Sequence, residues 1–376
     1  MKHYLNLEET LFRNRDAFEI DFVPEIFNFR EAQIKDIAYA IQPGLIGNRP
    51  LNQVLRGLPG TGKTTAVMRI FSEITETTQR LIPVYVNCQT DRSKYAVFSK
   101  IYCALHKHQP PAKGASVQRV VEDIGKTLNE KEAVLLVCFD DANYLLPGNH
   151  LNDILFILLR LYVAHPKARV GVLLPMSTMD VDLERALDAA VLSVLQPDQV
   201  YFPPYTEMEI REILNDRIKA GLFPGVLTDE MFTFLIDHTM RSGDMRVGLD
   251  LVKRSVMAAE RDGRSSVTEE DIKASFKVSR YVHMMAAIRA LSTEERELLG
   301  HIAALSLEIG KIDTMMVVFN YVNLSMKISI SGLFEKLRKF DDMRLIEFCQ
   351  MAGNGRTKGI ALRYAAVKVA EACAVG

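Results

Sequence analysis

The segment from Gly57 to Thr64 carries the residue types that bind a triphosphate. It reads Gly-Leu-Pro-Gly-Thr-Gly-Lys-Thr and so matches the complete G-x-x-x-x-G-K-[ST] pattern of a phosphate-binding loop. Its glycines allow the backbone to curl so that successive N–H groups point at one phosphate. Lys63 can reach the β- and γ-phosphates, and the hydroxyl of Thr64 can ligate a magnesium ion. The pattern therefore predicts a site for ATP or ADP with Mg²⁺.

The residues around this loop provide the structural context that the motif requires. Residues 53–56 are predicted to form a short strand before it, and residues 65–70 the first turns of a helix after it. The N-terminus of such a helix adds a partial positive charge beside the phosphates. The alternative is a chance match in a glycine-rich turn, and the strand and helix on either side count against it. The predicted nucleotide-binding residues of the loop are Gly60, Thr61, Gly62, Lys63, Thr64 and Thr65.

A second candidate element is a hydrophobic strand at 134–139 that ends in two carboxylates, Asp140 and Asp141. A nucleoside triphosphatase needs acidic side chains at the end of a second strand to hold magnesium and to orient the attacking water. We therefore predict that Thr64 and Asp140 bind the magnesium ion. The predicted catalytic residues are Lys63, Asp140 and Asp141. An ordinary strand with a polar end is the alternative.

Composition and charge narrow the class of protein. The 376 residues leave room for about two or three domains, and 48% apolar with 25% charged residues is ordinary for a soluble globular protein. No apolar run is long enough to span a membrane, and the N-terminus lacks the apolar core of a signal peptide. The five cysteines form no C-x-x-C pair, which argues against a zinc or redox site. We expect a cytoplasmic protein with no membrane partner.

Strands and helices alternate in the first half of the chain, which predicts a parallel sheet covered on both faces. The pattern changes after residue 204, where four helices follow one another. Near residue 279 a third region begins, in which three helices precede two strands joined by a glycine-rich basic loop, the order of a winged helix. The predicted strands are 53–56, 82–86, 133–139, 169–174, 199–202, 344–350 and 359–363. The predicted helices are 32–41, 93–107, 116–129, 150–164, 183–190, 206–219, 228–240, 244–261, 268–276, 293–306, 312–322 and 328–340.

Several short motifs outside the loop carry a family resemblance. They are Phe-Val-Pro-Glu at 22–25 with Phe-Arg-Glu at 29–31, Val-Asn-Cys-Gln-Thr at 86–90 with Ser-Lys-Tyr at 93–95, Tyr-Phe-Pro-Pro-Tyr at 201–205, and Gly-Asp-Met-Arg-Val-Gly-Leu at 243–249. With the phosphate loop and the acidic strand, they resemble the archaeal initiators related to origin recognition complex subunits and to their cell-division-cycle loader paralogues. These proteins are a branch of the AAA+ ATPases. The similarity extends over nearly the full length.

The resemblance implies a fold and a set of nucleotide contacts. The fold is α/β, with an AAA+ parallel-sheet domain that carries a helical lid and is followed by a C-terminal winged-helix domain. Residues 1–20 are polar, which predicts a loosely held N-terminal arm. With the pattern changes near residues 204 and 279, the resemblance implies 21–205 for the AAA+ base, 206–278 for the lid and 279–376 for the winged helix. Arg246 is expected to reach the γ-phosphate as the second sensor of the family. The implied nucleotide-binding residues outside the loop are Val23, Pro24, Arg30, Tyr205, Arg217 and Arg246.

Three departures from the family pattern imply slow hydrolysis. The family usually ends its acidic strand with Asp-Glu, but this chain has Asp141, whose side chain is one methylene shorter. The Asn at the tip of the fourth strand is absent, and Ser177 or Thr178 is the nearest polar candidate. Ala189 and Ala190 stand where an arginine that acts on a neighbour's nucleotide is expected. Because such an arginine is worth about 10³–10⁵ in rate, we expect ATP binding to be intact and hydrolysis to be impaired.

The C-terminal region has the charge of a nucleic-acid-binding surface. Between residues 325 and 363, eight basic and four acidic side chains give a net charge of +4, whereas the whole chain has a formal charge of −1. In a winged helix the third helix enters the major groove and the wing touches the DNA backbone. Arg92 and Lys94 are weaker candidates, and a protein-interaction module is the alternative. The predicted DNA contacts are Ser329, Ser331, Lys336, Arg338, Lys339, Arg356 and Lys358.

These predictions combine into an ATP-dependent, nucleoid-associated DNA-binding protein. The resemblance implies that it recognises double-stranded origin DNA and helps to recruit the replicative helicase, with paralogous initiator subunits as further partners. ATP is expected to act as a conformational switch, with different affinities for two states. Two alternatives stay open: a fast remodeller or clamp-loader-like motor, and a winged-helix regulator with a vestigial ATPase. The missing Asn and arginine count against the first, and the intact phosphate loop counts against the second.

Overall fold

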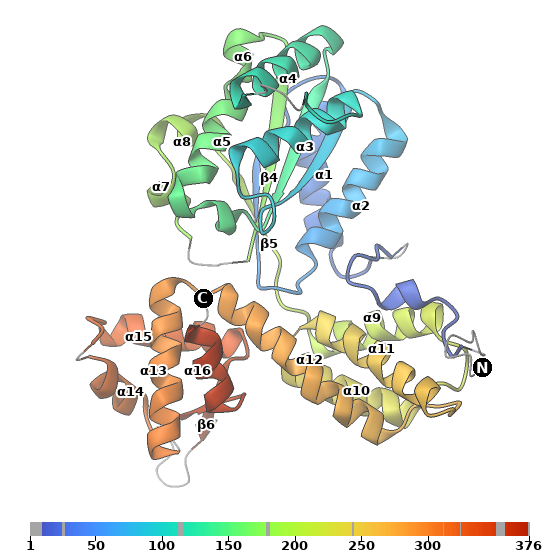
Figure 1. Ribbon diagram of the computed structural model, residues 1–376, viewed down its shortest axis with the longest axis vertical. Helices are drawn as coiled ribbons and strands as arrows, with labels where there is room; N and C mark the ends of the chain where they lie inside the picture. Colours follow the sequence, from blue (N-terminus) through green and yellow to red (C-terminus); the bar gives the residue numbers. More distant parts are fainter. Residues whose placement is uncertain are drawn as a thin grey trace. The chain divides into compact units, whose positions relative to one another are not determined.

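The computed structural model of the chain describes residues 10–24, 27–111, 116–177, 181–242, 244–310, 312–323, 325–350 and 358–374. The chain forms two compact units, one of residues 23–204 and one of residues 1–22 with 205–376 (Figure 1). Each unit has its own buried apolar core. None of the described helices is long and apolar enough to cross a membrane.

The first unit is built on one parallel sheet, as predicted. Its strands follow the order β2-β3-β4-β1-β5, and every neighbouring pair runs parallel. The carboxyl ends of the strands therefore meet at one edge of the sheet, where the phosphate loop follows β1 and the two carboxylates end β3. The strands are β1 Gln53–Arg56, β2 Leu81–Asn87, β3 Val134–Asp140, β4 Arg169–Met176 and β5 Asp198–Tyr201.

Strand β3 explains why helices cover both faces of this sheet (Figure 1). All of its residues are buried, and successive side chains point to opposite faces. Leu135 and Phe139 belong to the core with α3, α4, α5 and α8, whereas Leu136 and Cys138 belong to the core with α1 and α2. The helices are α1 Glu31–Leu45, α2 Lys63–Thr77, α3 Lys94–His106, α4 Val117–Lys131, α5 His150–Leu159, α6 Leu161–Ala164, α7 Leu183–Ala186 and α8 Ala189–Leu195.

Two helices that the sequence predicts as continuous are interrupted. The predicted helix at 150–164 divides at Arg160 into α5 and α6, and the one at 183–190 divides into α7 and α8. Arg160 donates to a backbone carbonyl of α8 at 3.0 Å. Just before α8, Asp188 and Asn152 exchange hydrogen bonds of 2.7 and 2.8 Å. Contacts between distant parts of the sequence thus accompany both breaks. The local pattern of apolar residues, from which the helices are predicted, carries no information about such contacts.

The second unit is mostly helical. Its first four long helices begin at the predicted places, and two of them begin with complete capping boxes, at Thr206 and Thr268. The helices are α9 Glu207–Gly221, α10 Asp229–Ser242, α11 Met245–Arg261, α12 Glu269–Arg289, α13 Thr293–Ile309, α14 Met315–Val322, α15 Ile330–Asp342 and α16 Ala366–Ala374. Strands β6 Ile346–Gln350 and β7 Lys358–Leu362 pair in antiparallel fashion.

Helix α12 is longer than the sequence analysis predicts. It continues from Glu269 to Arg289 instead of ending at residue 276, because no glycine or proline interrupts residues 277–289. The boundary predicted between residues 278 and 279 therefore falls inside a single helix. Helix α16 also lies outside the predicted elements.

The N-terminal arm packs onto the helices of the second unit, so the prediction of a loosely held arm is wrong for residues 10–20. Phe12 and Phe18 are buried in the core of α9, α10 and α11. The Arg13 N–H donates to the Gly221 carbonyl at 2.8 Å. Gly221 leaves no room for a side chain, because a Cβ there would collide with the Phe18 ring. Residues 10–20 are therefore an integral part of this unit.

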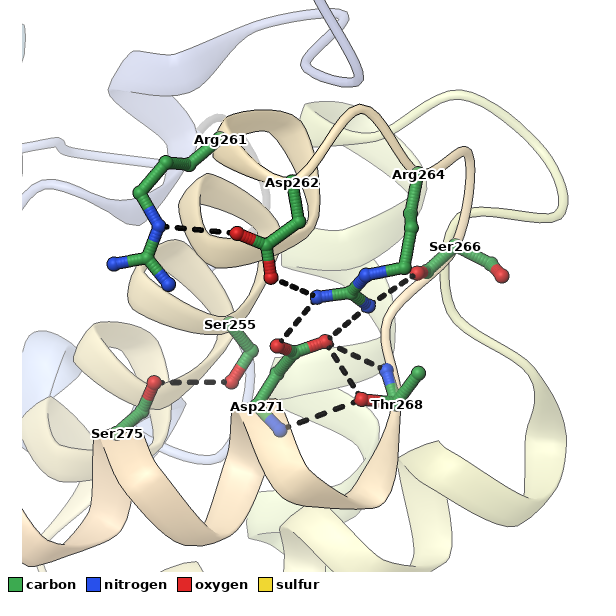
Figure 2. Close-up of polar contacts among 8 residues, drawn as sticks. All are labelled: Ser255, Arg261, Asp262, Arg264, Ser266, Thr268, Asp271 and Ser275. Atoms are coloured by element: carbon green, nitrogen blue, oxygen red, sulfur yellow. Dashed lines mark hydrogen bonds and ion pairs between the residues drawn. The ribbon is translucent and has the colours of Figure 1, made fainter.

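Arg264 closes the turn between α11 and α12 (Figure 2). Its two Nη atoms donate to the two carboxylate oxygens of Asp271 at 2.7 and 2.8 Å, and Nη2 also reaches Asp262 Oδ2 at 3.0 Å. Asp271 in turn accepts from the Thr268 N–H at 2.9 Å, which completes the cap of α12. Bidentate pairs of this kind are the strong form of a guanidinium–carboxylate contact. One side chain thus fastens both ends of the turn.

We expect Arg264→Met to lower the free energy of unfolding by about 1–3 kcal/mol, because the buried Asp271 carboxylate loses its charged partner. Chemical denaturation followed by circular dichroism measures the change. Arg261→Met is the matched control, since the exposed Arg261 side chain donates to Asp262 alone among the contacts drawn in Figure 2. We expect this control to change stability by no more than about 0.5 kcal/mol. Equal losses in the two variants would contradict the role assigned to Arg264.

The same contact predicts how stability depends on pH. Hydrogen bonding to Arg264 holds the pKa of Asp271 below its ordinary value. A carboxyl group whose pKa is lower in the folded state stabilises the fold above its unfolded pKa, about 3.9 for Asp, and this stabilisation is lost as the pH falls through the folded pKa. The stability difference between wild type and Arg264→Met should therefore be largest near neutral pH and shrink below about pH 4. Denaturation curves across this range test it, and a difference independent of pH would contradict it.

Candidate functional site

The phosphate loop joins β1 to α2, and its glycines make the path of the backbone possible. Gly60 and Gly62 have φ angles of 78° and 91°, in the left-handed region that favours glycine. Helix α2 begins directly after Gly62, so its first N–H groups have no partner within the helix. Gly57 lies against Phe202, whose carbonyl oxygen would be 2.6 Å from a Cβ at this position. The loop therefore presents backbone N–H groups and a helix N-terminus together, which is the geometry that binds phosphate.

Lys63 is the cation at the start of this helix. The residue is 5% exposed, and its Nζ donates to the carbonyl oxygens of Gly57 and Leu58 at 2.7 and 2.9 Å. The Thr61 hydroxyl donates to the same Leu58 carbonyl at 2.8 Å. The ammonium group thus lies against the loop backbone, where phosphate oxygens would offer it stronger, charged acceptors.

Asp140 lies at the carboxyl end of β3, close to the start of α2. Its Oδ2 accepts hydrogen bonds from Thr64 Oγ1 at 2.9 Å and from Tyr85 OH at 2.7 Å. Burial and the neighbouring Asp141 carboxylate raise the pKa of Asp140, while the bonds from Tyr85 and Thr64 oppose that rise. Burial and Asp140 in turn raise the pKa of the Tyr85 phenol, which keeps Tyr85 a neutral donor. The structure therefore brings Thr64 and Asp140 together and adds Tyr85, which no sequence motif indicates.

Asp141 is held by side chains that follow the two neighbouring strands. Its Oδ2 accepts from Gln89 Nε2, after β2, and its Oδ1 accepts from Ser177 Oγ, after β4, both at 2.6 Å. The Asp141 backbone has a φ of 54°, a left-handed conformation that Asp adopts more readily than most residues. Ser177 thus occupies the tip of the fourth strand beside Asp141, and Thr178 lies outside the described residues.

Thr64 and Asp140 fit a magnesium ion. Both offer oxygen ligands, and magnesium bound with a nucleotide commonly uses one or two protein oxygens together with phosphates and water. Within the described part of the chain, no cluster of three or more His, Cys, Asp or Glu side chains could hold a metal ion. The donor set therefore suits an ion that arrives with the phosphates rather than one held in a protein cage.

Arg30 supports the loop from behind. It is 2% exposed, and it donates to the Thr61 carbonyl at 2.9 Å and to the Pro203 carbonyl at 2.7 Å. The guanidinium group thereby ties the phosphate loop to the segment after β5. Val23 and Pro24, predicted together with Arg30, are half-buried in the same unit.

The predicted nucleotide contacts Tyr205, Arg217 and Arg246 belong to the second unit. Tyr205 packs against its core. Arg217 is buried and donates to the carbonyl oxygens of Ala17 and Phe22 at 3.1 and 3.3 Å, and burial lowers the pKa of its guanidinium group. Arg246 forms a 2.6 Å ion pair with Asp244, the N-cap of α11. Both arginines have partners inside this unit, and their contacts with a nucleotide stay predictions.

Two lysines of α15 that the sequence analysis assigns to DNA are engaged inside the second unit. Lys339 forms a 2.7 Å ion pair with Glu295 of α13, and the two side chains are 11% and 3% exposed. Lys336 lies 3.4 Å from the neighbouring Glu294. Because its ammonium group holds α13 and α15 together, Lys339 is removed from the predicted DNA contacts.

Three of the other predicted DNA contacts lie on exposed parts of the same region. Ser329, Ser331 and Arg338 are exposed, and the Ser329 hydroxyl also accepts a backbone N–H as the N-cap of α15. Lys358 begins β7, and Arg356 lies outside the described residues. Of the predicted DNA contacts, Ser329, Ser331 and Arg338 are therefore accessible in the structure.

The weaker DNA candidates belong to the first unit and have partners there. Arg92 donates to the Gln89 carbonyl at 2.9 Å and lies over the Tyr144 ring. Lys94 forms a 2.6 Å ion pair with Asp153.

Two family models match the chain. The model described as an AAA domain matches residues 49–178, and the model described as a Cdc6 AAA+ ATPase-type lid domain matches residues 211–277. The first match contains the phosphate loop, both carboxylates at the end of β3 and Ser177. The second begins within α9 and ends within α12.

Whole-chain comparisons agree with these matches. The chain is 37% identical to ORC1-type DNA replication protein 3 of Haloarcula marismortui, over 98% of this chain and 97% of the relative. It is 35% identical to ORC1-type DNA replication protein 6 of Halobacterium salinarum, over 96% of each chain.

Solved structures share the fold. The Aeropyrum pernix ORC1 protein in complex with DNA has a TM-score of 0.66 at 23% identity, over 98% of both chains. The Aeropyrum pernix ORC2 protein in its ADPNP–ADP complexes has a TM-score of 0.69 at 19% identity, over 97% of this chain and 98% of the other.

Proposed function

The chain belongs to the ORC1-type DNA replication proteins of the AAA+ class, and from this premise we propose that it is an ATP-dependent initiator. In this proposal it binds double-stranded DNA at a replication origin and helps to recruit the replicative helicase, with paralogous initiator chains as further partners. The observation that carries the proposal is the intact nucleotide site, in which Lys63 lies against the phosphate loop and Thr64 contacts Asp140. A solved relative of this fold in complex with DNA supports the proposed DNA binding, and another with ADPNP and ADP supports the proposed nucleotide binding.

Each residue of the nucleotide site has a proposed role. The backbone N–H groups of Gly60 to Thr65 bind the phosphates, and Lys63 contacts the β- and γ-phosphates. Thr64 and Asp140 hold the magnesium ion, which neutralises phosphate charge when bound. Tyr85 fixes the orientation of Asp140 through its 2.7 Å bond.

We propose that the chain divides its work among three regions. Residues 21–205 bind the nucleotide, helices α9 to α12 form a lid that contributes Arg217 and the second sensor Arg246, and the region beyond α12 forms a winged helix. ATP acts as a switch because it binds two conformations with different affinity. The N-terminal arm belongs with the lid in this proposal, because its aromatic residues complete the core of the lid helices.

We further propose that α15 is the helix that enters the major groove. It is the last of the three helices, α13 to α15, that precede the antiparallel β6–β7 pair, which is the order of a winged helix. Its exposed Ser331 and Arg338 are available for base or phosphate contacts. The surplus of positive charge between residues 325 and 363 supports this assignment.

ATP hydrolysis should be slow, well below the enzyme median of about 10 s⁻¹. Both oxygens of Asp141 are engaged by Gln89 and Ser177, and its side chain is shorter than the Glu of the family. Steady-state phosphate release, with and without duplex DNA, measures the rate. A turnover of many per second would favour the remodeller or clamp-loader-like motor over the initiator.

Chromatin immunoprecipitation with sequencing in the source organism tests the proposal as a whole. An initiator should give peaks centred on replication origins, and the peaks should weaken when Lys63 is replaced by alanine. Signal spread over promoters or over the whole chromosome, with no enrichment at origins, would favour the regulator with a vestigial ATPase.

A further inference from the structure

Helix α15 presents an apolar row to solvent. Ile330 and Phe334, each 48% exposed, are one helical turn apart, and the exposed Arg338 follows one turn later. A neighbouring face of the helix anchors it, because Leu333 and Leu337 are fully buried. The half-exposed apolar side chains are therefore separate from those that build the core.

The row is held at both ends. At the N-terminus, the Ser329 hydroxyl caps the helix by accepting the Gly332 N–H at 3.1 Å. In the C-terminal half, the buried Lys339–Glu295 pair fastens α15 to α13. Phe334 thus projects from the middle of a helix whose position the rest of the unit fixes, as a recognition surface requires.

The charges around the row suit a nucleic acid. Lys327, before the helix, and Arg338, near its end, are exposed, so the apolar centre has a cation on either side along the chain. A duplex groove has the complementary arrangement, with base edges on its floor and phosphates along both rims. Glu335 is the exposed carboxylate next to the row, and a carboxylate in the major groove can accept from the cytosine amino group.

We infer that Ile330 and Phe334 read the C5 methyl groups of thymine in the major groove. This inference rests on the proposed DNA-binding function and specifies the DNA that it prefers. Thymine alone among the four bases presents a methyl group on its major-groove edge, and apolar side chains are its partners. Contacts with phosphate carry no sequence information, so these two side chains add a preference that the surrounding cations do not supply.

Replacing thymine with uracil tests the inference, because it removes the methyl group and leaves every hydrogen-bonding atom in place. The full chain is titrated by fluorescence anisotropy against a duplex of alternating A·T pairs and against the same duplex with uracil at every thymine. Wild type should bind the thymine duplex more tightly, by about fourfold for each methyl group buried. Phe334→Ala should lose most of this preference and keep the affinity for the uracil duplex, and Ile330→Ser should lose part of it.

Phe223→Ala is the matched control, because Phe223 is 49% exposed in the same unit but outside α15. It should keep the wild-type preference for thymine. Tight and equal binding of wild type to both duplexes would overturn the reading of methyl groups and leave the proposed DNA binding standing. Failure to bind either duplex would overturn both. An unchanged preference in both the Phe334 and the Ile330 variants would assign the preference to other residues and also overturn the inference.

Discussion

Lys63→Ala should weaken ATP binding by roughly 10- to 150-fold, which corresponds to about 1.5–3 kcal/mol for a hydrogen bond to a charged group. The lysine is buried and its ammonium group lies against the loop backbone, so phosphate oxygens placed on the loop come within its reach. Alanine leaves the glycines of the loop and the start of α2 unchanged. Titration with a fluorescent ATP analogue measures the affinity, and circular dichroism verifies the fold.

Lys126→Ala provides the control for this experiment. Lys126 lies on α4 of the same unit, where its exposed side chain is 3.5 Å from Glu122. Its removal takes away one positive charge from the same domain but should leave ATP affinity unchanged. Wild-type affinity in the Lys63 variant would mean that the loop is not the nucleotide site. It would also contradict the proposal that ATP acts as a switch.

Arg356→Ala combined with Lys358→Ala should weaken binding to every duplex and reduce its dependence on salt. Each phosphate neutralised by Lys or Arg releases condensed counterions, so log K falls by about 0.9 per contact for each tenfold rise in salt. Removing two contacts should therefore flatten the slope by about two. Lys358 begins β7, and Arg356 belongs to the segment that joins β6 to β7. Anisotropy titrations of the full chain at several salt concentrations give the slope.

The control for the salt experiment is a double variant with the same change of charge elsewhere. Lys126 and Lys167 are exposed lysines of the first unit, and their replacement by alanine should leave the slope unchanged. An equal loss in both double variants would show that net charge alone matters. No change in either would remove the β6–β7 loop from the DNA surface and favour a protein-interaction role for the C-terminal region.

The sheet unit is predictable because its signals are local. The apolar run at 134–139 indicates a buried strand by itself, and the glycines of the phosphate loop mark a strand-to-helix turn by themselves. The breaks at Arg160 and before α8 depend instead on bonds such as Asn152 to Asp188, between residues 36 positions apart. No periodicity within a window of sequence contains that information.

A residue of the nucleotide site can be predicted from the sequence when it belongs to a motif. A residue that reaches the site only through the pairing of two strands cannot. Lys63 and Asp140 belong to motifs. Tyr85 belongs to none, and the motif at 86–90 that contains Gln89 does not predict its bond to Asp141. Both side chains reach the carboxylates because β2 pairs with β3 in the register that sets Asn87 opposite Asp140. The register of a parallel pair follows from the packing of the whole sheet, which the sequence does not state.

The predicted DNA contacts on α15 show again that contacts between distant residues cannot be read from the sequence. A count of charges along the sequence treats Lys339 and Arg338 alike, although they face different surroundings. The difference comes from Glu295, which lies 44 residues earlier in the chain and draws Lys339 into the interior. Ile330 and Phe334 fail to stand out in sequence for a related reason, because half-exposed and buried apolar residues look the same there.

The packing of the N-terminal arm sets the order in which the second unit can form on the ribosome. Thr10 and Leu11 both bond to Glu260, at sequence separations of 250 and 249. Translation at about 5–20 residues per second takes roughly 12–50 s to cover that stretch. Phe12 and Phe18 are thus synthesised early but cannot be buried until the helices that enclose them have emerged. The nucleotide-binding unit, residues 23–204, is complete before then, so these two aromatic side chains stay exposed in the period when aggregation competes with folding.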